Sequence, residues 1–115
     1  MAWTNVRLEL CPTPDHPGGS VSRAYLLRLP LDSHGVVDID AYDAMPVYAT
    51  VRRYWPQEPD RAGRAIRTSR GWLFSYTLPD SDREAILHRQ CPHFRLGAQV
   101  PIHDDGQKLM FRIMG

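Results

Sequence analysis

Alternation of apolar and polar residues is the dominant pattern of this 115-residue chain. In segment 3–10, Val6, Leu8 and Leu10 alternate with polar neighbours. A period of two places one face of a strand on a core and the other in water, so the segment is predicted to be a β-strand. The same pattern predicts strands at 22–29, 47–55, 63–68, 72–77, 99–103 and 108–114. Segment 85–90 fits either a strand or a helical turn, because its apolar residues do not decide between the two periods.

Glycine, proline and aspartate indicate where these segments are joined. A hairpin is predicted around 69–71, where Gly71 suits a positive φ, and another around 104–107, where Asp105-Gly106 is a residue pair that tight turns prefer. One short helix is predicted between 32 and 46, with Asp38 or Asp40 accepting from its first turn and Pro46 ending it. Seven or eight short strands at regular spacing predict an all-β, mostly antiparallel small barrel or sandwich.

Composition indicates one ordinary globular domain covering residues 1–115. The chain is 43% hydrophobic and 23% charged, and at this length it can bury a core without a metal or a disulfide. No apolar run is long enough to span a membrane, and the first residues lack the basic and apolar regions of a signal peptide, so we expect a cytoplasmic protein. Cys11 and Cys91 are therefore expected to be reduced thiols.

Charge is unevenly distributed although the net value is only +1. Residues 1–50 carry three arginines and six acids, whereas residues 51–72 carry six arginines and two acids. The small net charge argues against a polyanion-binding role for the whole surface, and the local excess points to segment 51–76 as the candidate binding surface. All basic residues but Lys108 are arginine, a bias that we attribute chiefly to coding composition rather than to anion recognition.

Arginines and aromatic residues are interleaved in that segment. Side chains exposed there would form a stacking platform with phosphate contacts, as in single-strand nucleic-acid binding. The alternative is that the aromatic side chains are core and the arginines form its solvated rim. Exposed Trp55 and Trp72 would favour nucleic acid, and buried ones would favour a protein interface. The candidate surface consists of Arg53, Trp55, Arg67, Arg70, Trp72 and Tyr76.

A second candidate site is the cluster His88, Cys91 and His93. Imidazole and thiolate groups bind zinc, but a structural site needs four ligands, and this spacing matches no known zinc pattern. A thiolate activated by a neighbouring imidazolium is the catalytic version of the same cluster, and it lacks a recognisable oxyanion site. We therefore predict no metal and no cofactor, with a small enzyme or metal site around Cys91 as the least favoured alternative.

The segments YLLRLPLD, ATVRRYW, GRAIRTSRGWLFSY and FRLGAQVPIHDDG…FRI resemble a set of small uncharacterised proteobacterial proteins. The resemblance covers most of the chain and implies no activity. From the residues themselves we expect a non-enzymatic binding or interaction module, because Arg, Trp and Tyr are enriched in protein interfaces. Self-association is the simplest version, with the basic middle of one chain meeting the acidic first half of another and dimerisation weakened by salt. Single-stranded nucleic-acid binding through 51–76 is the main alternative.

Overall fold

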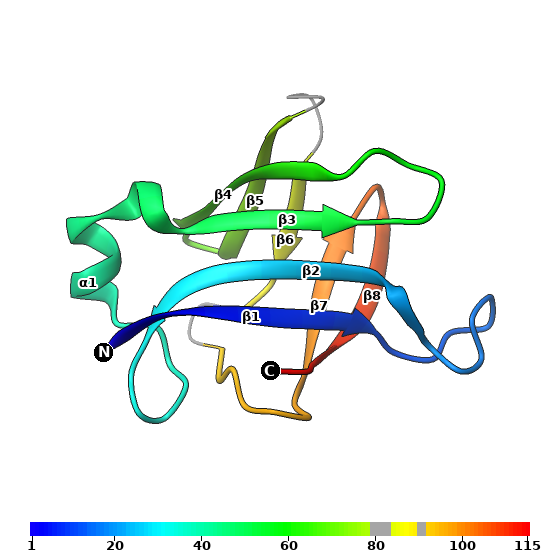
Figure 1. Cartoon of the computed structure of the whole chain (residues 1–115), viewed down its shortest axis with the longest axis horizontal. Coiled ribbons are helices and arrows are strands. Elements are labelled where there is room, and N and C mark those ends of the chain that lie inside the picture. Colours follow the sequence, from blue (N-terminus) through cyan, green and yellow to red (C-terminus); the bar gives the residue numbers. More distant parts are fainter. Residues whose placement is uncertain (79–83, 90–91) are drawn as a thin grey trace.

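Eight antiparallel strands form a closed barrel in the computed structural model (Figure 1), which describes residues 1–78, 84–89 and 92–115. Each strand pairs with the next along the chain, and the last pairs with the first. The all-β prediction is confirmed, and the architecture is a barrel. The strands are β1 (Ala2–Leu10), β2 (Ser20–Leu31), β3 (Thr50–Tyr54), β4 (Arg61–Thr68), β5 (Gly71–Leu78), β6 (Glu84–Leu87), β7 (Gln99–Asp104) and β8 (Gln107–Ile113).

Large apolar side chains fill the barrel interior. The alternation predicted for β1 is confirmed, since Val6, Leu8 and Leu10 are all buried. Tyr25 lies at the centre, with its ring centroid 5.4 Å from that of Phe74 and 5.0 Å from that of Phe111. An eight-stranded barrel has an interior that side chains can fill, and the buried side chains here form one continuous cluster. The interior is therefore the hydrophobic core.

The short helix covers one end of the barrel, which we call the helix end. Helix α1 (Ile39–Ala44) begins after Asp38, whose carboxylate accepts from the Ala41 amide, as one of the two predicted caps requires. Tyr42 of α1 packs edge-on against Trp72 with ring centroids 5.0 Å apart. Its hydroxyl donates to the Ala65 carbonyl oxygen. The opposite end, surrounded by loops 11–19 and 55–60 and the turn at 105–106, is the mouth of the barrel (Figure 1).

Most predicted strand boundaries lie within two residues of the observed ones, and two segments differ in a more informative way. The strand expected over 47–55 begins only at Thr50, because residues Pro46–Tyr48 form the 3-10 helix η1, with Pro46 as its first residue. The ambiguous segment 85–90 forms a strand over Glu84–Leu87, whereas Gln90 lies outside the described residues. No helix in the described ranges combines the length and the apolar character that crossing a membrane would require.

Glycine is required at a turn and at an irregularity in the sheet. Gly71 has a φ of +138°, in agreement with the positive φ predicted for it, and Asp105 and Gly106 have φ values of 52° and 78° in the predicted tight turn. The register of β4 against β5 shifts at Gly63. A Cβ atom on Gly63 would lie 1.9 Å from the backbone oxygen of Ser75, so no other residue fits there without displacing β5.

The barrel closes where β8 meets β1. Three residue pairs form this junction, from Leu8 opposite Ile113 to Leu10 opposite Phe111. Two further backbone hydrogen bonds extend it, from the Met114 amide to the Arg7 oxygen (2.8 Å) and from the Arg7 amide to the Gly115 oxygen (3.2 Å). Closure removes the unpaired edges that an open sheet would expose.

Candidate functional site

Charged side chains lie inside the barrel near its mouth. Arg53 of β3 and Asp104 of β7 are 6% and 7% exposed, and Tyr25 of β2 is completely buried. Arg53 Nε donates to Asp104 Oδ2 at 2.7 Å, and the Tyr25 hydroxyl donates to the same oxygen. The two charges neutralise each other away from water, which is the condition under which a core tolerates them.

Glu58 extends this buried network toward the mouth. Its Oε1 atom accepts from Arg53 Nη1 at 3.2 Å and lies 3.5 Å from Arg61 Nη2. The Tyr76 hydroxyl interacts electrostatically with Tyr25 and Asp104, but it makes no hydrogen bond of normal geometry to the described residues. The result is a chain of charged groups, extended by the Tyr25 hydroxyl, that joins β2, β3, β4 and β7 with the loop after β3.

Both tyrosines of the network stay protonated over the ordinary pH range. Burial, followed by the neighbouring Tyr76 and Asp104, raises the pKa of Tyr25 far above its usual value. Burial and then Asp104 also raise the pKa of Tyr76. Burial lowers the pKa of Arg53, but the attraction of Asp104 and of Tyr25, together with hydrogen bonds to both, outweighs burial and the net shift is upward. The protonation states of the network are therefore fixed over this pH range, which fits a structural role better than a role in proton transfer.

Trp55 lies where the network reaches the mouth. The Arg53 guanidinium carbon is 4.0 Å from the centroid of the Trp55 ring, and that of Arg23 is 5.9 Å away. Trp55 also lines a hollow of about 480 Å³ that is bounded by the ends of β1, β2 and β8 and by loop 11–19. Its lining comprises Leu10, Thr13, Pro14, Asp15, His16, Arg23, Trp55, Gln107, Lys108 and Leu109.

The structure corrects the candidate surface predicted over 51–76. Arg53, Trp72 and Tyr76 are buried and cannot contact a partner, because β3 and β5 direct these alternate positions into the barrel. Trp55 is half-buried at the mouth, whereas Arg67 and Arg70 are exposed around the β4–β5 turn at the helix end. The six residues therefore do not form one surface.

The His88, Cys91 and His93 cluster is only partly described. Cys91 lies outside the described residues. His88 packs edge-on against His103 with ring centroids 4.6 Å apart, and desolvation followed by the charge of His103 lowers the pKa of His88. His93 pairs instead with Val36 in an isolated bridge. Over residues 1–78, 84–89 and 92–115, no three histidine, cysteine or acidic side chains gather as a metal site would require.

Cys11, the other cysteine, is a buried free thiol. Burial raises its pKa, and the charge of Arg112 offsets only part of that effect. A raised pKa lowers the fraction of reactive thiolate, so Cys11 has the properties of a core residue rather than of a nucleophile.

Another set of arginines and aromatic residues lies on the outside of β1–β4. Arg28, Arg52 and Arg64 are exposed, and none of them forms an ion pair with any described residue. Arg28 and Arg52 line a shallow groove of about 290 Å³. We call this surface the outer arginine face; it consists of Trp3, Arg28, Tyr48, Arg52, Tyr54 and Arg64.

Two aromatic residues of the outer arginine face, Trp3 and Tyr48, lie beside Arg28. The Arg28 guanidinium carbon lies 5.9 Å from the ring centroid of Trp3 and 5.8 Å from that of Tyr48. The two rings pack edge-on at 5.6 Å, and Tyr48 remains 44% exposed. The alternation of β3 already separates Arg52 and Tyr54 from the buried Arg53, so the sequence contained the signal for this face.

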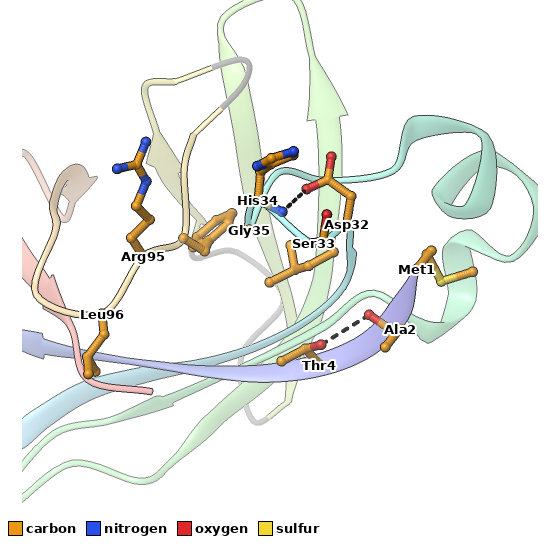
Figure 2. Close-up of a pocket in the computed structure, with 11 residues that line it drawn as sticks. Met1, Ala2, Thr4, Asp32, Ser33, His34, Gly35, Arg95 and Leu96 are labelled. Atoms are coloured by element: carbon orange, nitrogen blue, oxygen red, sulfur yellow. Dashed lines mark hydrogen bonds between the residues drawn. The ribbon is translucent and has the colours of Figure 1, made fainter.

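A wider hollow of about 800 Å³ lies between the start of β1, the turn at 32–35 and segment 94–96 (Figure 2). Two of its oxygen-bearing side chains, those of Asp32 and Thr4, already form hydrogen bonds with the local backbone. Asp32 accepts from the His34 and Val36 amides, bonds that lower the pKa of its carboxyl group, and Thr4 donates to the Ala2 oxygen. His34 and Arg95 are exposed side chains from separate loops. We therefore regard this hollow as a surface depression.

Comparison with known proteins gives no match to a protein-family model, to a curated protein or to a solved structure. Function is therefore inferred from the residues of this chain alone.

Proposed function

We propose that this protein is a non-enzymatic interaction module whose contact surface is the outer arginine face. The observation that supports the proposal is that Arg28, Arg52 and Arg64 are exposed on one side of the barrel with no acidic partner among the described residues. Unpaired guanidinium groups beside exposed rings have the composition of interface hot spots, in which Arg, Trp and Tyr dominate. A partner with carboxylates at matching positions would complete these interactions.

The simplest partner is a second copy of the chain. Asp40 and Asp43 of α1 are exposed and have no ion pair with any residue in the described ranges. In a two-fold dimer both copies use the same surface. The acidic residues of α1 in each copy would contact Arg52 and Arg64 of the other, so every contact would occur twice. Such a contact between exposed charges is screened by salt, with a Debye length of about 10 Å at 0.1 M.

Nucleic acid is the less favoured partner. Trp72 and Tyr76 are each only 1% exposed, so of the three aromatic residues expected on the stacking platform Trp55 alone reaches the surface, with the Arg53 guanidinium against its ring. The outer arginine face offers phosphate contacts, but its rings are partly engaged with one another. A net charge of +1 also gives little general attraction to a polyanion.

Sedimentation velocity over a range of protein concentrations tests the proposal. We expect a dimer in 20 mM salt that dissociates in 500 mM salt. R52E/R64E should weaken dimerisation by at least about tenfold, because the symmetric dimer would lose several exposed charged contacts of about 0.2–1 kcal/mol each and gain repulsion in their place. Adding D40R/D43R to that variant should restore the dimer by exchanging the charges. The matched control is R95E/R112E, which makes the same change in net charge at exposed positions outside the outer arginine face.

A monomer at low salt and at the highest concentration reached would contradict self-association. A twelve-nucleotide oligothymidine tests the alternative partner. If it binds the wild type and R95E/R112E but not R52E/R64E, the outer arginine face is a nucleic-acid-binding surface. The two measurements use the same variants and therefore separate the two partners.

A further inference from the structure

The hollow at the mouth of the barrel is separate from the outer arginine face and shares no residue with it. Its floor continues the inward-facing positions of the barrel, since Leu10, Trp55 and Leu109 follow the buried columns of β1, β3 and β8 to their ends. Its side wall is loop 11–19. At about 480 Å³ the hollow has the size of a small-molecule site, and barrel mouths are common places for such sites.

Loop 11–19, the side wall of the hollow, is held by hydrogen bonds within the loop. The Thr13 amide donates to the His16 oxygen at 2.9 Å, and the His16 amide donates back to the Thr13 backbone oxygen at 3.1 Å and to its hydroxyl at 3.0 Å. The Gly19 amide donates to the same His16 oxygen. A wall held by its own backbone needs little ordering when a ligand binds, which favours affinity.

The lining combines an apolar floor with unpaired positive charge. Arg23 and Lys108 form no ion pair with any described residue, and Asp15 is the one acid in the lining, so the hollow has a net charge of +1. The Arg23 guanidinium is held near Trp55 and donates to the Ser20 hydroxyl at 3.2 Å. Thr13 and Gln107 add polar groups at the rim.

The buried network fixes the position of Trp55. Arg53 is held by Asp104 at 2.7 Å and by Glu58 at 3.2 Å, and its guanidinium carbon lies 4.0 Å from the Trp55 centroid. The Tyr25 ring supports the indole from within the barrel at 6.4 Å between centroids. A preorganised aromatic wall beside the Arg23 guanidinium, which has no acidic partner among the described residues, is suited to a ligand with an apolar body and one anionic group.

We propose that the mouth of the barrel binds a small molecule of this class, with an aromatic or otherwise apolar body against Trp55, Leu10 and Leu109 and a single carboxylate, sulfonate or phosphate group between Arg23 and Lys108. The site is independent of the proposed interaction surface, and it needs no catalytic step.

Titration with 8-anilinonaphthalene-1-sulfonate, an anionic aromatic probe, tests the site when followed by the indole N–H signals of ¹⁵N-labelled protein. The chain has three tryptophans, and W55F assigns the Trp55 signal by removing it. We expect one-to-one saturation with the largest shift at Trp55. R23Q and K108Q should each weaken binding by about tenfold, and R112Q, an exposed arginine of β8 outside the hollow, should not. The neutral analogue N-phenyl-1-naphthylamine should bind more weakly and should not respond to R23Q.

Three results would overturn the proposal: no saturable binding, saturation that leaves the Trp55 signal unmoved, or equal affinity in wild type, R23Q and K108Q. Each variant is first checked for an unchanged pattern of backbone amide signals, so that loss of binding is not confused with loss of the fold. R52E/R64E should bind the probe like the wild type, which separates this site from the outer arginine face.

Discussion

Replacing Asp104 with asparagine tests the role of the buried network. The substitution keeps the shape of the side chain and removes its charge. Arg53 then remains 6% exposed with only Glu58 as an acidic partner, and the Glu58 side chain is 40% exposed. The Tyr25 hydroxyl also loses the charged acceptor to which it donates. The variant therefore leaves a buried guanidinium group largely uncompensated.

The expected loss of stability is large, although the substitution only replaces one carboxylate oxygen with an amide group. Removing one member of a buried ion pair costs about 3–5 kcal/mol, and we expect about 3 kcal/mol because asparagine retains one acceptor oxygen. A chain of this length has an unfolding entropy of about 0.24 kcal/mol per kelvin at its melting temperature. The melting temperature of D104N should therefore fall by about 12 °C.

Thermal unfolding followed by circular dichroism measures this change, and a second variant tests its cause. The triple variant Y25F/R53M/D104L removes both charges and the hydroxyl together, so that no polar group is left unpaired. Replacement of a whole buried pair by apolar residues is often neutral or stabilising, and this variant should melt closer to the wild type than D104N does. A melting temperature of D104N within about 2 °C of the wild type would refute the view that Asp104 compensates a buried charge.

Two further predictions concern the core and the sheet. Burial raises the pKa values of Tyr25 and Tyr76 above those of the unfolded chain, so their stabilising protonated state is complete below pH 10 and is lost as the pH rises further. In a titration followed at 295 nm, these two tyrosines should ionise only together with unfolding. Above pH 10, each should reduce the free energy of unfolding by about 1.4 kcal/mol per pH unit. Ionisation of all five tyrosines in one step with the fold intact would contradict this prediction. G63A should destabilise the barrel by at least about 2 kcal/mol in urea unfolding, because its Cβ would lie 1.9 Å from a backbone oxygen of β5. The control is G18A, which should have little effect because the added Cβ meets nothing within 4 Å.

Local patterns in the sequence were sufficient to predict seven of the eight strands, and they left β6 undecided between a strand and a helical turn. Alternation in β1 and the turn residues Gly71 and Asp105-Gly106 act over a few positions, so the sequence could reveal them. Closure into a barrel depends on the pairing of β1 with β8, about a hundred residues apart, and no local pattern reports it. The start of β3 was predicted three residues early because Val47 and Tyr48 have high strand propensity but follow Pro46 in a 3-10 turn.

The candidate site was harder to predict for a specific reason. Arg53 lies at an inward position, and an arginine in a strand is ordinarily assigned to the surface. Its burial depends on Asp104, 51 residues away, and on Tyr25 in a third strand. Only the assembled barrel brings these groups together. Arg52, its neighbour, faces the opposite side because successive strand residues alternate, and this alternation places Arg52 on the outer arginine face.

Closure of the barrel has a consequence for the newly made chain. The strand β1 is synthesised first, and its second edge can be paired only after β8 has been translated and has left the ribosome. Until then the nascent protein is an open sheet with two unpaired edges, which is the form most prone to join neighbouring chains. The three residue pairs between Leu8–Leu10 and Phe111–Ile113 therefore form last and close the barrel. Chains that stop before Gln107 should accumulate as aggregates rather than as a smaller barrel.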